Sequence, residues 1–242
     1  WDRSYDDVLA LALSNLTAKP VVGWVGTDDR IFRLVGGDDY VSARLLSGDY
    51  LDRLPFTGGI VVCAPTRTDL FAVAEDDAEA LIEVFDVSLE ASRHGLPVSL
   101  HPLRFSGGGW SDLQLGPDHP AYVGWRRLTR LDWAREAAST RTLLQDLVGT
   151  EVFVGSLIVR EDEATGMTDT VSVWSEGVPT LLAAADLVAF PRSDRDAGFV
   201  TTSWQRVSEV LAHRMIATEH YPERWLVETF PSDDELTALV NQ

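Results

Sequence analysis

The sequence predicts an α+β fold made of two sequence-related halves, each a mostly antiparallel sheet with a covering amphipathic helix. Two short apolar runs, Gly59–Pro65 and Asp186–Pro191, both end in proline, and these prolines lie 126 residues apart (191 minus 65). The helix expected after each run keeps the same offset, since Leu81, Val84, Phe85 and Leu89 fall on Val207, Val210, Leu211 and Met215. A pattern of apolar positions that repeats at one constant offset indicates an internal duplication.

Cap and turn residues place the elements of the first half. Residues 1–19 are expected to form a leading helix, which Asp6 or Asp7 caps and which ends before the Lys19-Pro20 pair. The first repeat is expected over residues 20–115. Its predicted strands are 21–25 and 30–35, which form a hairpin, and 40–46, 61–65, 70–74 and 98–105, with a helical turn at 48–54 and a helix at 77–94.

The second half follows the same order of elements. Residues 116–150 are expected to hold a loop and a connecting helix (132–148), after a surface loop that begins at Gly107. The second repeat, 151–242, has predicted strands at 152–160, 170–174, 187–191, 199–201 and 225–230, and helices at 178–184, 203–217 and 233–240. Six elements of each half, over residues 40–105 and 170–230, thus share the order β-α-β-β-α-β, and these two ranges are expected to superpose.

Composition restricts the classes of function. The chain has 20 basic and 38 acidic side chains and a net charge of −18. Such a surface repels phosphate, which argues against nucleic acid or an anionic membrane as the main partner. One cysteine cannot build a disulfide framework, and neither a signal peptide nor an apolar run of about 18 residues is visible. We therefore expect a cytoplasmic protein, and no motif indicates a cofactor.

Three segments carry a resemblance to a known family. They are Tyr5–Leu16, Asp39–Leu46 and Val61–Asp69, all in the first half of the chain. In these segments the sequence resembles the YtpQ-like family of uncharacterised bacterial cytosolic proteins. The resemblance implies an intracellular bacterial protein of α+β type, and it implies no activity and no catalytic residue.

Paired aspartates are the first candidates for a functional site. Carboxylates gather in predicted turns and helix starts of the first half, at Asp28-Asp29, Asp38-Asp39, Asp49, Asp52 and Asp76-Asp77. Turns of neighbouring strands often share one sheet edge, so we expect an acidic edge that attracts a basic protein. The alternative is a uniformly acidic coat that serves only solubility. Gly36–Asp39 also resembles a magnesium loop, but Gly-Asp pairs are the default residues of tight turns, and we predict no metal site.

Arginine and tryptophan side chains are further candidates. Arg67 and Arg192 follow the two repeated prolines and could form a carboxylate-binding pair, although each could equally pair with a local aspartate. Trp110 and Trp125, in or beside the predicted loop, could line an exposed binding surface. The glycine run before Trp110 lacks the Gly-Lys-Ser/Thr ending of a phosphate loop, which favours a flexible turn.

Nucleophiles and bases are sparse. Cys63 lies in an apolar strand with no cationic neighbour in sequence, which favours a buried small side chain over a reactive thiol. His101 and His119 belong to no metal-binding pattern. These observations favour a non-catalytic protein-binding or regulatory module, of which immunity-like neutralisation of a basic partner is the most concrete form. The alternative is a hydrolase or transferase that uses Asp38, Asp39 and a histidine brought close by the fold.

Overall fold

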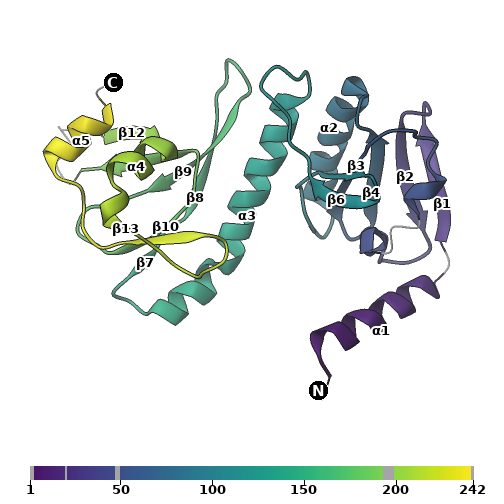
Figure 1. Ribbon diagram of the computed structural model, residues 1–242, viewed down its shortest axis with the longest axis horizontal. Helices are drawn as coiled ribbons and strands as arrows, with labels where there is room; N and C mark the ends of the chain where they lie inside the picture. The colour runs from purple at the N-terminus through teal and green to yellow at the C-terminus, as the bar shows by residue number, and fades with distance from the viewer. Residues whose placement is uncertain (1–2, 20, 47–49, 193–198, 241–242) are drawn as a thin grey trace. The chain divides into compact units, whose positions relative to one another are not determined.

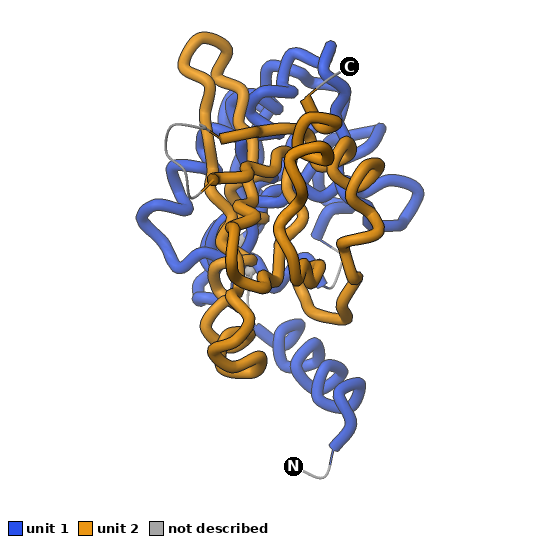
Figure 2. Tube along the Cα trace, turned by 90° about the vertical axis from the view of Figure 1, so that its left-hand side faces the viewer, with its two compact units in different colours: residues 1–129 blue, residues 130–242 orange. Residues whose placement is uncertain are grey.

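The computed structural model describes residues 3–19, 21–46, 50–192 and 199–240 and has the α+β fold that the sequence predicts. It divides into two compact units, residues 1–129 and 130–242, coloured separately in Figure 2. The boundary lies inside helix α3 (Tyr122–Val148), which begins earlier than predicted, so this helix contributes to both units. Asp49 lies outside the described residues.

Unit 1 is built on one six-stranded sheet in which every neighbouring pair is antiparallel (Figure 1). The strand order is β1-β2-β4-β3-β5-β6. The strands are β1 (Val21–Thr27), β2 (Ile31–Gly36), β3 (Ile60–Thr66), β4 (Asp69–Ala74), β5 (Leu103–Ser106) and β6 (Gly109–Asp112). The helices are α1 (Tyr5–Thr17), α2 (Ala78–His94) and two short 3-10 helices, η1 (Ser42–Leu46) and η2 (Leu51–Arg53).

Strand β3 is the centre of unit 1 because it is buried on both faces. Val62 and Ala64 pack with Leu51 into one core cluster, on the side of the 3-10 helices. On the opposite face helix α2 packs against β3 through its buried side, which includes Leu81, Val84 and Phe85. A register shift between Cys63 and Thr66 allows a proline, which cannot donate a ladder hydrogen bond, to lie within this central strand.

Unit 2 contains two four-stranded sheets. One has the order β13-β14-β10-β7 and the other β12-β11-β9-β8, and each has one parallel pair, β7 with β10 and β9 with β11. The strands are β7 (Phe153–Val154), β8 (Leu157–Glu161), β9 (Thr168–Val173), β10 (Thr180–Ala183), β11 (Leu187–Pro191), β12 (Phe199–Ser203), β13 (Met215–Ala217) and β14 (Arg224–Val227). The helices after α3 are α4 (Trp204–Val210), the 3-10 helix η4 (Ala212–Arg214) and α5 (Asp233–Val240).

One core joins the sheets and helices of unit 2. It combines Leu182 of β10, Phe190 of β11 and Val227 of β14 with residues of α4 and α5, all fully buried or nearly so. A smaller cluster holds Leu144 of α3 against Val154 and Leu181.

The segment 40–46 was predicted as a strand, and this prediction is wrong. Residues 42–46 form η1, whose Arg44 is buried. The Arg44 guanidinium donates from Nη1 to the Leu16 carbonyl (2.7 Å) and from Nη2 to Asp38 Oδ2 (2.9 Å). A buried guanidinium needs such partners, so the segment leaves the sheet and packs against α1.

The glycine-rich stretch after Ser106 was predicted as a loop but contains strand β6. Gly107 and Gly108, at φ of 59° and 79°, form the tight turn between β5 and β6. Two-residue hairpin loops need this left-handed geometry, which glycine adopts without a steric penalty. The strand predicted over 98–105 is correspondingly short and begins only at Leu103.

Two helices predicted in unit 2 are also wrong. Residues 180–183 form strand β10, because Gly177 at φ 82° breaks the chain before them and both edges of the strand are paired, to β14 and β7. The helix predicted over 203–217 ends at Val210, and Met215–Ala217 pairs with β14 instead. In both places strand pairing overrides the helix propensity of Leu, Ala and Met.

The internal duplication is not confirmed. An antiparallel hairpin followed by a helix does occur in both units, as β3-β4-α2 and as β11-β12-α4. Its surroundings differ, because the second neighbour of β3 is antiparallel β5, whereas that of β11 is parallel β9. The helices also differ, with 17 residues in α2 and 7 in α4. The shared pattern is therefore local and does not extend to the sheet topology.

Candidate functional site

The predicted aspartate pairs lie at opposite ends of the β1–β2 hairpin. Asp28 and Asp29 occupy the turn after the Thr27–Ile31 pair, whereas Asp38 and Asp39 follow Gly36, which pairs with Val21 at the other end. The expectation that both pairs share one edge of the sheet is therefore wrong. Antiparallel strands place successive turns at alternate ends of a sheet.

The Asp28-Asp29 turn has a strained backbone. Both residues have positive φ, 51° and 55°, and Arg30 N donates to the Thr27 carbonyl (3.2 Å). This is the backbone of a type I′ turn, in which Asn-Gly is the usual pair and Asp is less favourable. Both carboxylates are exposed, and neither bonds to any residue that the structure describes.

Arg30 joins this turn to the start of α2. Its Nε donates to Asp77 Oδ2 (2.8 Å), its Nη2 to Asp77 Oδ1, and its Nη1 to Glu79 Oε2 (2.9 Å). These hydrogen bonds lower the pKa of Asp77 to about 2 and raise that of Arg30. Asp77 also caps α2 by accepting from Ala80 N (3.0 Å). The turn and the first turn of α2 therefore lie side by side.

The outer side of α2 continues this acidic region. Glu83 and Asp86 are exposed and bond to no described residue. The residues directly before and after this pair are exposed apolar side chains, Ile82 (41 %) and Val87 (37 %). We define the acidic face as the five unpaired carboxylates of this region, Asp28, Asp29, Asp76, Glu83 and Asp86.

The other end of the hairpin brings Asp38, Asp39 and Arg67 together. Asp38 pairs with Arg44 and accepts from Tyr40 N (3.0 Å), while Asp39 is exposed. Arg67 lies over the Tyr40 ring, with its Cζ 5.7 Å from the ring centre. Beside them is a hollow of about 400 Å³ lined by residues 33–39, Val41 and Thr68.

Neither histidine candidate lines this hollow. His101 faces Asp112, with Nε2 3.5 Å from Oδ1, and the His119 Nδ1 accepts from Ala121 N (3.1 Å) near the start of α3. Because Asp38 is engaged by Arg44, the hollow also offers no unbound pair of carboxylates. The arrangement of a general acid and base that the enzyme alternative requires is not assembled there.

The two tryptophan candidates differ in exposure. Trp110 is 38 % exposed on the edge strand β6 and packs on Phe105, with ring centres 5.0 Å apart. Trp125 is buried, and its Nε1 donates to the Leu113 carbonyl (2.9 Å), so it belongs to the core and not to a binding surface. The prediction for Trp125 is therefore wrong.

Arg192 and Cys63 both have local roles. Arg192 Nη2 lies 2.6 Å from Asp233 Oδ1, within unit 2, so the alternative of a local ion pair holds for it. Cys63 is buried as predicted, and burial raises the pKa of its thiol to about 12, which keeps the thiol protonated and unreactive.

Among the residues that the structure describes, no group of three or more His, Cys, Asp or Glu side chains is placed to hold a metal ion. The helices in this part of the chain include none that is both long and apolar enough to cross a membrane.

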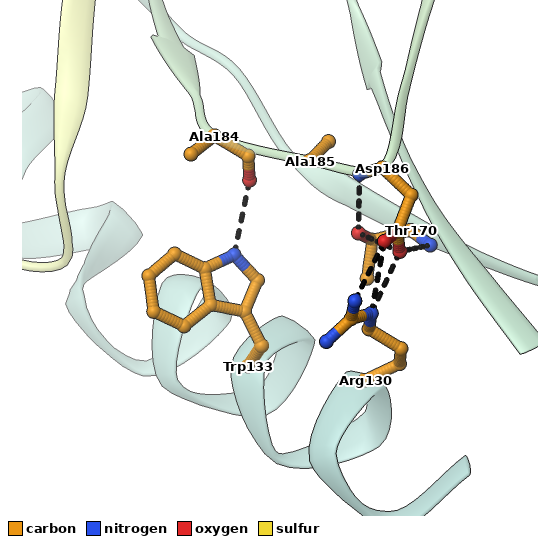
Figure 3. Close-up of a pocket in the computed structure, with 6 residues that line it drawn as sticks. All are labelled: Arg130, Trp133, Thr170, Ala184, Ala185 and Asp186. Carbon is orange, nitrogen blue, oxygen red and sulfur yellow. Dashed lines mark hydrogen bonds and ion pairs between the residues drawn. The ribbon is translucent and has the colours of Figure 1, made fainter. Parts of the chain in front are cut away.

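Unit 2 has a pocket that sequence reasoning missed (Figure 3). Arg130 forms a bidentate ion pair with Asp186 and donates from Nε (2.8 Å) and Nη2 (2.7 Å). Thr170 donates to the same carboxylate from N (2.8 Å) and Oγ1 (2.9 Å). The Trp133 Nε1 donates to the Ala184 carbonyl (3.0 Å), which fixes the indole. The pocket measures about 240 Å³.

The polar groups of this pocket satisfy one another. They tie α3 to strands β9 and β11, which is a structural role. No sequence pattern relates Arg130 to an aspartate 56 positions away, so only the fold identifies the pair.

Comparisons with protein-family models, with curated proteins and with solved structures gave no match. The resemblance to the YtpQ-like family therefore remains an expectation. A proposal of function must therefore rest on the surfaces of the two units.

Proposed function

We propose that this chain is a non-catalytic binding module of the cytoplasm that holds a basic protein on the acidic face of unit 1, in a regulatory or immunity-like neutralising role. The observation that carries the proposal is a set of five exposed carboxylates, from the Asp28-Asp29 turn to the outer side of α2, that pair with no described residue. None of these carboxylates forms an ion pair or a hydrogen bond with a residue that the structure describes.

This set is locally unfavourable for the fold. Glu83 and Asp86 are three positions apart on one helix, where like charges cost about 0.2–0.5 kcal/mol. Asp28 and Asp29 lie in left-handed backbone, which costs about 1–2 kcal/mol per residue for most side chains and less for Asp. Features that cost stability tend to occur at functional sites, because the partner compensates for them.

The acidic face also offers apolar contact. Ile82 and Val87 are exposed among the carboxylates of α2. Charges mainly raise the rate of encounter with an oppositely charged partner, and desolvated apolar contacts supply the affinity. A basic protein with a small apolar patch fits both features.

The enzyme alternative is less well supported. Asp38 is bound to Arg44, and the histidines lie away from the hollow beside it. The hollow therefore lacks the acid–base pair that a hydrolase or transferase would use.

A charge-neutral variant tests the proposal. Asp28→Asn, Asp29→Asn, Glu83→Gln and Asp86→Asn remove four negative charges, and Asn accepts left-handed backbone at least as well as Asp does. The control variant removes four exposed carboxylates of unit 2, through Asp146→Asn, Glu151→Gln, Glu163→Gln and Glu219→Gln. Both are used as bait in a pull-down from native lysate, quantified by mass spectrometry.

The wild type and the control should recover a protein of high isoelectric point that the acidic-face variant loses. Its association rate, measured with the purified partner, should fall as salt shortens the Debye length from about 10 Å at 0.1 M to about 3 Å at 1 M. Equal recovery by both variants, or a rate independent of salt, would contradict the proposal.

A further inference from the structure

A groove lies within unit 1 between helix α1 and the 3-10 helix η1. Its volume is about 380 Å³, within the range of about 300–1,000 Å³ typical of ligand pockets. Its walls are mainly apolar, formed by Leu9, Leu13 and Leu16 of α1 and by Ala43 and Leu46 of η1. We refer to it as the α1 groove.

Hydrogen bonds at both ends of α1 order this wall of the α1 groove. Ser4 and Asp7 form a capping box at the start of α1, which stabilises the helix from its first turn. The buried Arg44 of η1 donates to the Leu16 carbonyl at the other end of α1. Leu46 nevertheless stays 63 % exposed along the groove, so its apolar surface is available to a ligand.

Two cations contact the ring of Tyr40, which lines the groove together with Lys19. Lys19 Nζ lies 5.1 Å and Arg67 Cζ 5.7 Å from the centre of the Tyr40 ring, both within cation–π range. Neither side chain pairs with a carboxylate of the described residues. Of the nearby acids, Asp38 is bound to Arg44 and Asp39 is exposed in the loop.

This charge arrangement is opposite to that of the chain as a whole. The net charge is −18, and Lys19 is the single lysine of the sequence. Lys19 and Arg67 contact the same ring and pair with no carboxylate of the described residues, so both can attract an anion from outside the chain. An apolar groove with Lys19 in its wall and Arg67 against the Tyr40 ring is complementary to a molecule with an alkyl chain and an anionic head.

We propose that the α1 groove binds a single-chain alkyl carboxylate, that is, a fatty acid. Its alkyl chain lies along Leu9, Leu13 and Leu46, and its carboxylate is held by Lys19 and Arg67 beside the Tyr40 ring. This site is separate from the acidic face, so the two proposals can fail independently.

Calorimetric titration of the full chain with octanoate, decanoate and dodecanoate tests the site. Burial of each further methylene should tighten binding, by about tenfold for two methylenes. Decanoate should bind with a Kd below about 1 mM, whereas decylammonium, with the same chain and the opposite charge, should not bind measurably.

Variants separate the two halves of the site. Lys19→Gln with Arg67→Gln should weaken decanoate binding at least about tenfold, since each charged hydrogen bond is lost. Leu46→Ser, at an exposed position that the core does not need, should weaken it by a similar factor and reduce the gain per methylene. Arg53→Gln is the matched control, because Arg53 contacts the ring of Tyr50, which, unlike Tyr40, does not line the groove. This variant should leave binding unchanged.

Three results would overturn the proposal. The first is no heat of binding with any of the three carboxylates. The second is equal affinity for decanoate and decanol, which would mean that the cations do not bind the carboxylate. The third is a wild-type dimer, seen by sedimentation, that Leu46→Ser dissociates, because the groove would then be covered by a second copy of the chain.

Discussion

At the scale of single residues, the resolved pKa shifts of carboxylates come mainly from their hydrogen-bond donors. Hydrogen bonds from Arg30 lower the pKa of Asp77, and those from Arg214 lower the pKa of Glu235 to about 2. Both carboxylates also lie at the first turn of a helix, α2 and α5, where the helix dipole favours negative charge. These pairs therefore hold helix starts in place and are not candidates for acid–base chemistry.

Glu235 gives a pH-dependent prediction. Its carboxylate accepts from Arg214 Nε and Nη2 (both 2.9 Å) and from Ser232 N (2.7 Å), so Glu235→Gln should lower the stability of unit 2 by about 1 kcal/mol near neutral pH. The folded pKa is depressed from 4.5 to about 2. The contribution is therefore present above 4.5 and is lost as the pH falls towards 2.

The measurement is urea unfolding at several pH values, followed by near-ultraviolet circular dichroism of the Trp204–Trp225 pair, whose ring centres are 4.9 Å apart. Wild type and Glu235→Gln should converge as the pH falls through this window. A difference that stays constant, or grows, in acid would show that Glu235 acts through packing alone.

At the scale of elements, the sequence predicted what local signals determine. The β1–β2 hairpin, the leading helix, α2 and α5 follow from turn residues, caps and apolar spacing, and all are present. Elements set by distant partners were missed. Residues 180–183 are a strand because β14 and β7 flank them, and η1 forms because Arg44 reaches the Leu16 carbonyl.

The same division applies to the candidate site. The acidic turns were identified from composition, since Asp-rich turns are visible in the sequence. Two features of the site depend on the sheet register and on the placement of α1. One is the separation of the acidic turns to opposite ends of a hairpin, and the other is the contact of both Lys19 and Arg67 with the Tyr40 ring. No periodicity in the sequence encodes either.

The docking of α2 on the sheet gives a prediction at this scale. Phe85 is 1 % exposed, and α3 approaches it so closely that a Cβ on Gly124 would lie 3.3 Å from the Phe85 ring. Phe85→Ala should cost about 3–5 kcal/mol because it leaves a cavity in this packing. Ile82→Ala, on the exposed side of the same helix, should cost less than about 1 kcal/mol. Chemical unfolding of both variants measures the loss in the free energy of unfolding. Similar losses for the two variants would mean that α2 does not pack through its Phe85 side.

At the scale of the whole molecule, the charge of −18 destabilises the compact state through self-repulsion. The acidic face concentrates part of this repulsion, because its carboxylates have no cations of their own. Elsewhere in unit 1 arginines pair with carboxylates, as Arg33 does with Asp69 and Arg104 with Glu75. The surface that we propose to bind a partner therefore carries a stability cost.

This cost should depend on salt. At low ionic strength the four-site acidic-face variant should melt a few degrees above wild type, and the difference should shrink as salt rises from about 0.01 M to about 1 M, where the Debye length falls from about 30 Å to about 3 Å. The unit 2 control variant should gain less, because its four carboxylates are dispersed. Asn at positions 28 and 29 can also relieve backbone strain, but that gain does not depend on salt. The salt-dependent part of the melting temperature, from calorimetry, is therefore the quantity that reports repulsion. If both variants show the same salt dependence, the carboxylates of the acidic face do not repel one another more than any others, and electrostatic attraction of a basic partner to this face loses its physical basis.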